Sequence, residues 1–413
     1  MKRRGVVLAC VTAVLAFPAT AHIAVPMRRP WRTRMIACVR TSCLLVLVGG
    51  GTSCASRPRG HADDIERRGA GPGAVGVTLV SDEADAALAL LRKRRAGTPP
   101  DATDWARLFG TRGYRRLKTR ELGMRRAFTD SAFRAFVLSD SLLARLPALE
   151  VAVADYRRLD VGAQAARALR YLPPGATIHA TLYLTVKPRP NSFVWADSAV
   201  RSVVLYVDPA RPRAAVEHDV VAHELHHIGY AETCDAGGVR AGAAAATPGP
   251  ASPTPAARAR AQDARTWLGA FGEGLAMLAA AGGPDAHPHA RSPDSVRARW
   301  DRDYARWRDD LPHIEQFLSD VAAGRLADPD AVRAAAATFY GDAQGPWYTV
   351  GYAMAVTVER AYGRERLVGA ICDPARLLTL YNAAARAANA RQSGAADQLP
   401  LWSDALLAAL GGA

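Results

Sequence analysis

The sequence predicts an α+β protein that is mostly helical, with a small β-sheet ahead of a His-rich helix. Of its 413 residues, 49% are hydrophobic but only 7% are aromatic, so small side chains supply much of the apolar fraction and favour closely packed helices. Residues 177–186 are β-branched and largely alternating, as in a strand. Residues 220–229 contain His-Glu-x-x-His within an amphipathic helical pattern.

Residues 1–54 have the composition of an export leader. Lys2-Arg3-Arg4 precedes an apolar run from Val6 to Phe17 and then Ala19-Thr20-Ala21, which is typical of a secretory signal. A second run, Leu44–Val48, stands just before Cys54 and resembles a bacterial lipoprotein signal. We therefore expect an exported protein of the cell envelope, anchored through a lipidated Cys54 or secreted; the true start codon stays open.

The net charge of +14 does not indicate a nucleic-acid partner. Residues 1–54 carry eight positive side chains and no acidic ones, so the remaining 359 residues carry only +6. Those charges are mixed in sign, without a basic stripe interleaved with aromatic residues. We expect no nucleic-acid binding.

Residues 55–172 are predicted to form a tether and then an N-terminal helical region. Residues 55–75 are rich in Gly, Arg and Ala and are interpreted as a flexible tether. Residues 76–172 follow as the helical region, which Pro173-Pro174-Gly175 ends. The helical patterns cover Ser81–Arg95, with Ser81 as N-cap, then Asp104–Leu117, Asp130–Leu146 and Ala148–Leu172.

Residues 173–413 are predicted to form the second region, in which the sheet leads into the His-rich helix. Its strands are predicted at Thr177–Val186, Phe193–Trp195 and Val203–Val207. An Ala- and Pro-rich stretch, 235–263, is interpreted as a disordered insertion. Helices resume at Ala264 and continue to the C-terminus.

The spacing of the His-Glu-x-x-His motif is suited to a metal. His223 and His227 are four apart, so a helix places both imidazoles on one face, where they can bind one Zn²⁺. Glu224 lies about 100° round the helix and can reach a metal-bound water. The alternative is a solvated polar face, against which Val220 and Ile228 argue because they make the segment amphipathic.

Glu273 is the candidate third ligand, since a catalytic zinc site uses three protein ligands. On a helix it points away from the apolar stripe of Trp267, Phe271 and Leu275, on a face of small residues. A Gly on each side costs helix stability and suggests that another backbone approaches closely there. The alternative is a surface Glu on an amphipathic helix.

Only two cysteines, Cys234 and Cys372, lie beyond the leader. They are either two unrelated buried thiols or a disulfide that an oxidising compartment permits. A disulfide requires their Cα atoms to lie within about 7 Å.

These motifs resemble the gluzincin group of zinc metallopeptidases and, more closely, a family of bacterial zinc-dependent peptidases, over roughly residues 175–385. The resemblance rests on His223-Glu224-Leu225-His226-His227, Gly272-Glu273-Gly274-Leu275-Ala276, residues 347–355 (Trp-Tyr-Thr-Val-Gly-Tyr-Ala-Met-Ala), Glu359, Gly363 and Tyr381-Asn382. It implies a zincin-like core and zinc-dependent hydrolysis of a peptide or protein. His223, His227 and Glu273 would then be the ligands and Glu224 the general base.

Within residues 347–355, Tyr348 is the candidate oxyanion donor, because a neutral phenol keeps its proton at pH 7. Tyr352 and then His226 are the next candidates, and both tyrosines could instead be core residues.

The sequence departs from thermolysin-like members at Met277, where they carry an Asp, so the partner of the ligand His stays open. Endo- or exopeptidase specificity, substrate and oligomeric state stay open too. So does another class of function: a cell-envelope lipoprotein that uses the fold for binding without catalysis.

Overall fold

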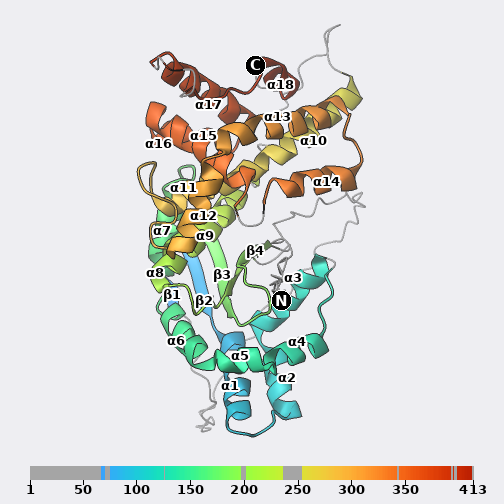
Figure 1. Cartoon of the computed structure of the whole chain (residues 1–413), viewed down its shortest axis with the longest axis vertical. Helices are drawn as coiled ribbons and strands as arrows, with labels where there is room; N and C mark the ends of the chain where they lie inside the picture. The colour runs from blue at the N-terminus through green and yellow to red at the C-terminus, as the bar shows by residue number, and fades with distance from the viewer. Residues whose placement is uncertain are drawn as a thin grey trace, which may run out of the picture.

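A mixed sheet of five strands lies at the middle of the computed structural model, with helices on either side of it along the long axis (Figure 1). The strand order is β1-β2-β3-β5-β4; β2, β3 and β5 run parallel, and the outer strands β1 and β4 are antiparallel to their neighbours. The strands are β1 (Arg67–Gly69), β2 (Val75–Val80), β3 (Ile178–Thr185), β4 (Phe193–Ala196) and β5 (Arg201–Tyr206). The structure describes residues 67–69, 75–124, 126–196, 201–235, 254–341, 344–391, 394 and 398–411.

The middle of the sheet is buried on both faces. Residues 182–185 of β3 and residues 202–205 of β5 are all buried, which is the pattern of parallel strands that helices cover on both sides. Helices α1, α3 and α9 contact these two strands, and α7 contacts β2. The helices up to the third strand are α1 (Asp82–Arg95), α2 (Ala102–Gly110), α3 (Arg112–Gly123), α4 (Asp130–Val137), α5 (Asp140–Ala144), α6 (Leu146–Tyr156) and α7 (Val161–Leu169).

Helix α9, which carries the His-Glu motif, packs closely on β3. A Cβ at Gly229 would lie only 2.3 Å from Leu172 Cδ1 and 2.9 Å from Ile178 Cγ1, so any larger residue would force these side chains to shift. The surrounding segment consists of α8 (Arg213–Ala215), the π-helical turn η1 (Val216–Val221), α9 (Ala222–Tyr230) and a second π-helical turn, η2 (Ala231–Asp235).

The C-terminal half is helical and is built around α15, which contacts α11, α13, α16 and α17. Its elements are α10 (Pro255–Leu268), the 3₁₀ turn η4 (Gly269–Phe271), α11 (Gly272–Ala281), α12 (Asp294–Tyr304), α13 (Trp307–Ala323), α14 (Pro329–Thr338), α15 (Pro346–Tyr362), α16 (Arg364–Val368), α17 (Pro374–Asn389) and α18 (Asp404–Ala409). Figure 1 shows α10 and α13 side by side at the C-terminal end of the molecule, in line with their contacts.

The predicted α+β class with mostly helices is confirmed, and the three predicted strands occur within two residues of their expected ends. The helical interpretation of residues 76–80 is wrong, because they belong to β2, which pairs with β3 about a hundred residues later. The tether prediction is wrong at Arg67–Gly69, which is β1, and the disordered insertion is wrong from Pro255, where α10 begins. The predicted leader, Cys54 and residues 236–253 lie outside the described residues.

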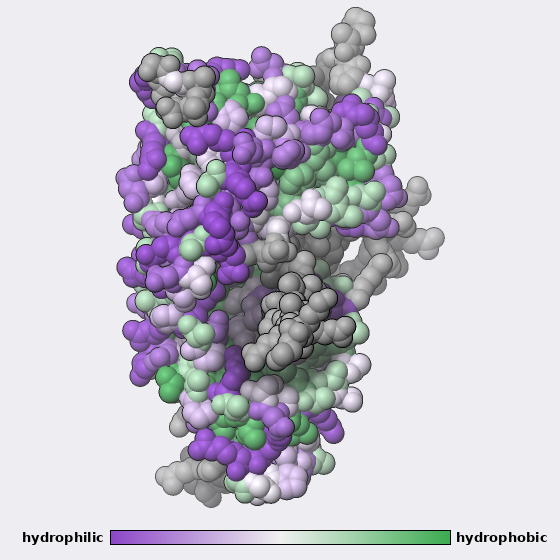
Figure 2. Space-filling view, viewed as in Figure 1, coloured by the Kyte–Doolittle hydropathy of each residue, from purple (hydrophilic) through white to green (hydrophobic). Residues whose placement is uncertain are grey.

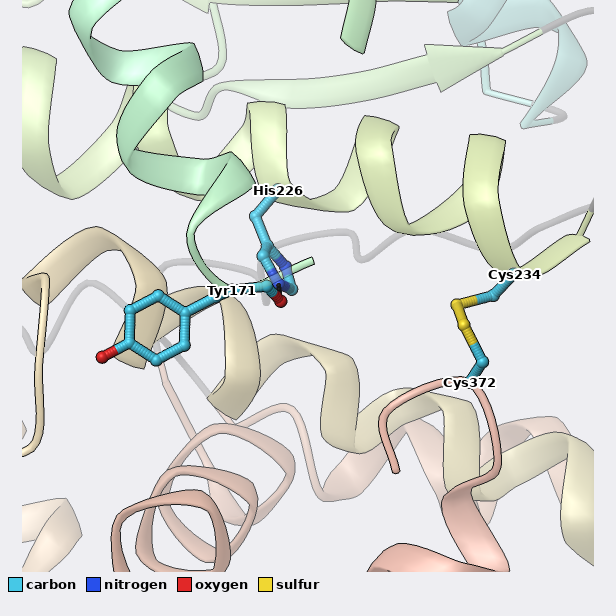
Figure 3. The surroundings of a disulfide bond; sticks show 4 residues. All are labelled: Tyr171, His226, Cys234 and Cys372. Carbon is cyan, nitrogen blue, oxygen red and sulfur yellow. Dashed lines mark hydrogen bonds between the residues drawn. A yellow bond between two sulfur atoms is a disulfide. The ribbon is translucent and has the colours of Figure 1, made fainter. Parts of the chain in front are cut away.

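Cys234 and Cys372 form a disulfide, with Cα atoms 5.1 Å apart. The bridge ties η2, directly after α9, to the connection between α16 and α17 (Figure 3). Of the two alternatives that the sequence left open, the structure therefore shows the disulfide.

Figure 2 shows hydrophilic residues over much of one face, with hydrophobic ones in separate patches. Within the described segments, every helix is too short or too polar to cross a lipid bilayer.

Candidate metal centre

Three side chains that are distant in sequence meet beside α9. The Nε2 atoms of His223 and His227 lie 3.0 Å apart, and each lies 3.1 Å from Oε2 of Glu273. All three side chains are mostly buried. The structure thus brings together the three residues that the sequence predicted as metal ligands.

Local helix geometry explains this convergence. His223 and His227 are one turn apart on α9 and so face the same way, and Glu273 projects from the first turn of α11, which packs on α9. Helix α11 in turn lies against α15: a Cβ at Gly274 would lie 2.1 Å from the backbone nitrogen of Tyr352. The predicted close backbone approach therefore occurs at Gly274, whereas a Cβ at Gly272 would enter open space.

The donor set fits a zinc ion. Two imidazole nitrogens and a carboxylate oxygen are usual zinc ligands, and tetrahedral bonds of about 2.0–2.1 Å would separate two such ligands by roughly 3.3 Å. The distances of 3.0–3.1 Å are close to that separation. Among the described residues this is the one group of three or more His, Cys, Asp or Glu side chains able to hold a metal ion.

The charge of Glu273 also suits a cation. Burial by itself would raise the pKa of the Glu273 carboxyl, but the charge of His227 and the hydrogen bonds from both imidazoles outweigh burial and lower that pKa. The group is therefore an ionised carboxylate enclosed by nitrogen ligands. No partner within the described structure bonds Nδ1 of His223, and Met277, one turn after Glu273, supplies none.

Glu224 lies beside the three ligands but is not one of the group. Its side chain is buried, and burial raises the pKa of its carboxyl despite the nearby charges of His223 and His227. The backbone N–H of Val194, on β4, donates to this carboxylate, while Oε2 has no partner within the described structure. One oxygen of Glu224 is thus held by the sheet and the other stays available to accept a proton.

Tyr348, in the first turn of α15, reaches the same site. Its ring is nearly parallel to that of His223, with centroids 6.1 Å apart, and its hydroxyl donates to Glu273. Burial and the charges of Glu273 and Glu224 raise the pKa of the phenol well above its usual value, so it stays protonated at neutral pH.

The two alternatives to Tyr348 point elsewhere. The hydroxyl of Tyr352 donates to the carbonyl of Ala286 at 3.3 Å. Nε2 of His226 lies 3.2 Å from the carbonyl of Tyr171, to which it donates (Figure 3), and burial lowers the pKa of His226 to about 3. His226 therefore joins α9 to the end of the preceding helical region and does not face the metal ligands.

Sequence reasoning missed one aromatic residue near the centre, Tyr340. Its ring centroid lies 6.5 Å from that of Tyr348, and burial together with the charge of Glu273 raises the pKa of its phenol. It lies between α14 and α15, outside any motif that the sequence offered, and only the fold brings it to this place.

Comparison with known protein families gives a match over the C-terminal part of the chain. The family described as "Putative zinc dependent peptidase (DUF5700)" matches residues 161–390, which include every residue of the centre. No curated protein and no solved structure matches the chain.

Proposed function

The chain belongs to this zinc-dependent peptidase family, and on that premise we propose that it hydrolyses peptide bonds with zinc held by His223, His227 and Glu273. The proposal rests on one observation: the three largely buried metal ligands lie beside two further groups. These are the Glu224 carboxylate, whose Oε2 has no partner within the described structure, and the protonated phenol of Tyr348. A purely structural metal site would not need the last two groups.

Each of the chain's own groups has a task in this reaction. When bound, zinc polarises the scissile carbonyl and makes water more acidic. Glu224 takes a proton from the attacking water and delivers it to the leaving amine, and its raised pKa makes it a better proton acceptor. Tyr348 donates a hydrogen bond to the oxyanion that develops at the carbonyl.

The sheet supports a peptide as the substrate. Strand β4 ends the strand order, so within the described residues its outer edge has no paired strand. Val194, on this strand, bonds Glu224, so an extended peptide that paired with β4 would lie next to the base. We therefore propose a peptide or protein substrate in an extended conformation.

The proposed class is gluzincin-like, with a zincin-like core. Two His on α9 and a Glu on a later helix, α11, follow the order of ligands in that group. The parallel strands under α9 are compatible with such a core.

We also propose that the protein is exported, by the leader in residues 1–54, and that Cys54 attaches it to a membrane. The Cys234–Cys372 disulfide supports export, because such bonds persist in oxidising compartments. Incorporation of labelled palmitate that depends on Cys54 tests the attachment, and recovery of the full-length chain from the cytoplasm would contradict export.

Glu224→Gln tests the proposed reaction. The amide cannot accept the water proton, so kcat for a peptide library should fall by about 10²–10⁴-fold while one zinc per chain remains. Glu365→Gln, at an exposed glutamate on α16, is the matched control and should retain parental kcat. Parental kcat in Glu224→Gln would contradict the role of the base, and absence of hydrolysis in the zinc-loaded parent would favour a binding protein.

A further inference from the structure

A chain of side-chain hydrogen bonds runs beside the metal centre without belonging to it. Ser292 Oγ donates to the Asp219 carboxylate, and Nδ1 of His289 lies 3.1 Å from Ser292 Oγ. Nε2 of His289 lies 2.7 Å from Oε1 of Gln344, whose Nε2 donates to the sulfur of Met277 at 3.3 Å. Asp219, His289 and Ser292 are all buried.

This network includes a residue of α11 and residues of the segments directly before α9 and α15, the three helices that carry the centre. Asp219 lies one turn before His223, in η1, and Met277 lies one turn after Glu273, in α11. Gln344 stands four residues before Tyr348, just ahead of α15. Both ring nitrogens of His289 are bonded. This residue therefore links the segment before α9 to α11 and to the segment before α15.

The two sides of His289 have different partners. Ser292 gives its one hydroxyl proton to Asp219, and Nδ1 of His289 pairs with the Ser292 oxygen. The amide nitrogen of Gln344 faces Met277, so its oxygen accepts from Nε2 of His289. The two ring nitrogens of His289 thus bond two different partners, and each bond can be removed by itself.

Backbone hydrogen bonds from Gly345 to Tyr340 and from Trp347 to Phe339 hold the start of α15, and the side chain of Gln344 adds a further attachment. Gly345, its N-cap, provides no side-chain cap, and Tyr348 lies in the first turn that follows. The side chain of Gln344 is thus a direct attachment between the segment that precedes this turn and the rest of the centre.

We propose that His289 is a positioning residue that, through Gln344, holds the first turn of α15 so that Tyr348 faces the metal-binding side chains. The inference rests on the proposed function for its effect on catalysis, but the effect on α15 stands independently of that function. Zinc binding itself does not depend on the link.

Two substitutions separate the bonds of His289. In His289→Asn the amide nitrogen takes the place of Nδ1 and keeps Ser292 but cannot reach Gln344. In His289→Gln the amide nitrogen takes the place of Nε2 and keeps Gln344. His289→Asn should lower kcat by about 10–100-fold with KM and zinc content unchanged, and His289→Gln should restore most of kcat.

A double-mutant cycle with Tyr348→Phe tests whether the effect passes through Tyr348. In the Tyr348→Phe background, His289→Asn should cause little further loss of kcat, because the group it positions is gone. Additive losses, equal losses in the Asn and Gln variants, or loss of zinc in His289→Asn would each overturn the proposal.

Hydrogen exchange gives a readout that does not require activity. The amides of residues 347–352 should exchange faster in His289→Asn than in His289→Gln, with α9 and α11 unchanged. This difference is expected even if Glu224→Gln retains parental activity, so failure of the proposed reaction and failure of the positioning role are told apart. Equal exchange in the two variants would overturn the positioning role.

Discussion

Tyr348 is the residue whose chemistry can be tested most simply. Its hydroxyl bonds Glu273, and its raised pKa keeps the proton that an oxyanion requires. Tyr348→Phe should leave zinc and folding intact and lower kcat by about 10²–10³-fold. Tyr352→Phe is the matched control, because that hydroxyl bonds Ala286, and its kcat should stay near the parental value. Equal kcat in the parent and Tyr348→Phe would remove Tyr348 from the mechanism.

At the residue scale, how well the sequence predicted a position depended on how local its signal was. His223, Glu224 and His227 lie on one helix, so their spacing alone predicted their common location. Glu273 was identifiable from the small residues around it, which the approach of α15 at Gly274 explains. His289 joins the centre only through contacts between distant segments, so no pattern in the sequence indicated it.

At the element scale, the packing of α11 on α15 provides a sharp test. In Gly274→Ala the new Cβ would meet the backbone of Tyr352 and Gly351, which cannot move aside as a flexible side chain can. We expect the free energy of unfolding to fall by about 1–3 kcal/mol or more, with weaker zinc binding because α11 carries Glu273.

Gly272→Ala is the matched control on the other side of Glu273. Its Cβ would enter open space, and Gly272 has helical backbone angles, so Ala should be neutral or stabilising by about 0.5–1 kcal/mol. Urea unfolding and zinc titration of the two variants give the measurement. Equal stability in both would contradict the account of this helix contact.

The predicted helices were longer than the real ones because capping side chains interrupt them. Thr111, Ser139 and Asp160 each accept a hydrogen bond from a backbone N–H of the helix that follows. A continuous apolar periodicity hides such breaks. Strand β2 was missed for another reason: its partner β3 is distant in sequence, and only the assembled sheet makes Val75–Val80 a strand.

At the scale of the whole molecule, Glu83 couples stability to pH. It is fully buried on α1, and its Oε2 accepts from the backbone N–H of Val186 at 2.7 Å, just after β3. Burial raises the pKa of this carboxyl from 4.5 to about 8. Between these values the folded chain holds a proton that the unfolded chain has released, so stability falls as pH rises.

Glu83→Gln should remove this contribution to the pH dependence of stability, because the amide keeps the bond to Val186 and does not titrate. The free energy of unfolding is measured by urea unfolding at about pH 5 and at about pH 6.5. Its decrease from the lower to the higher pH should be smaller in Glu83→Gln than in the parent. The window lies below the pKa of Lys187, which burial lowers to about 7. Glu365→Gln is again the control, and an unchanged slope in Glu83→Gln would contradict the assignment.

The disulfide joins two regions that are far apart in the sequence. Its cysteines are 138 residues apart, and nothing in their local sequence indicated pairing. Because one of them directly follows α9, the bridge fastens the helix that bears both histidines to the C-terminal helices.

The central claim is that His223, His227 and Glu273 together hold the zinc ion. Anomalous diffraction from crystals of the zinc-loaded protein, recorded on both sides of the zinc absorption edge, tests it most directly. We predict one strong peak within about 2.2 Å of Nε2 of both histidines and of a Glu273 carboxylate oxygen. A peak bound by other side chains, or one in which Glu273 lies beyond bonding distance, would contradict the three-ligand centre.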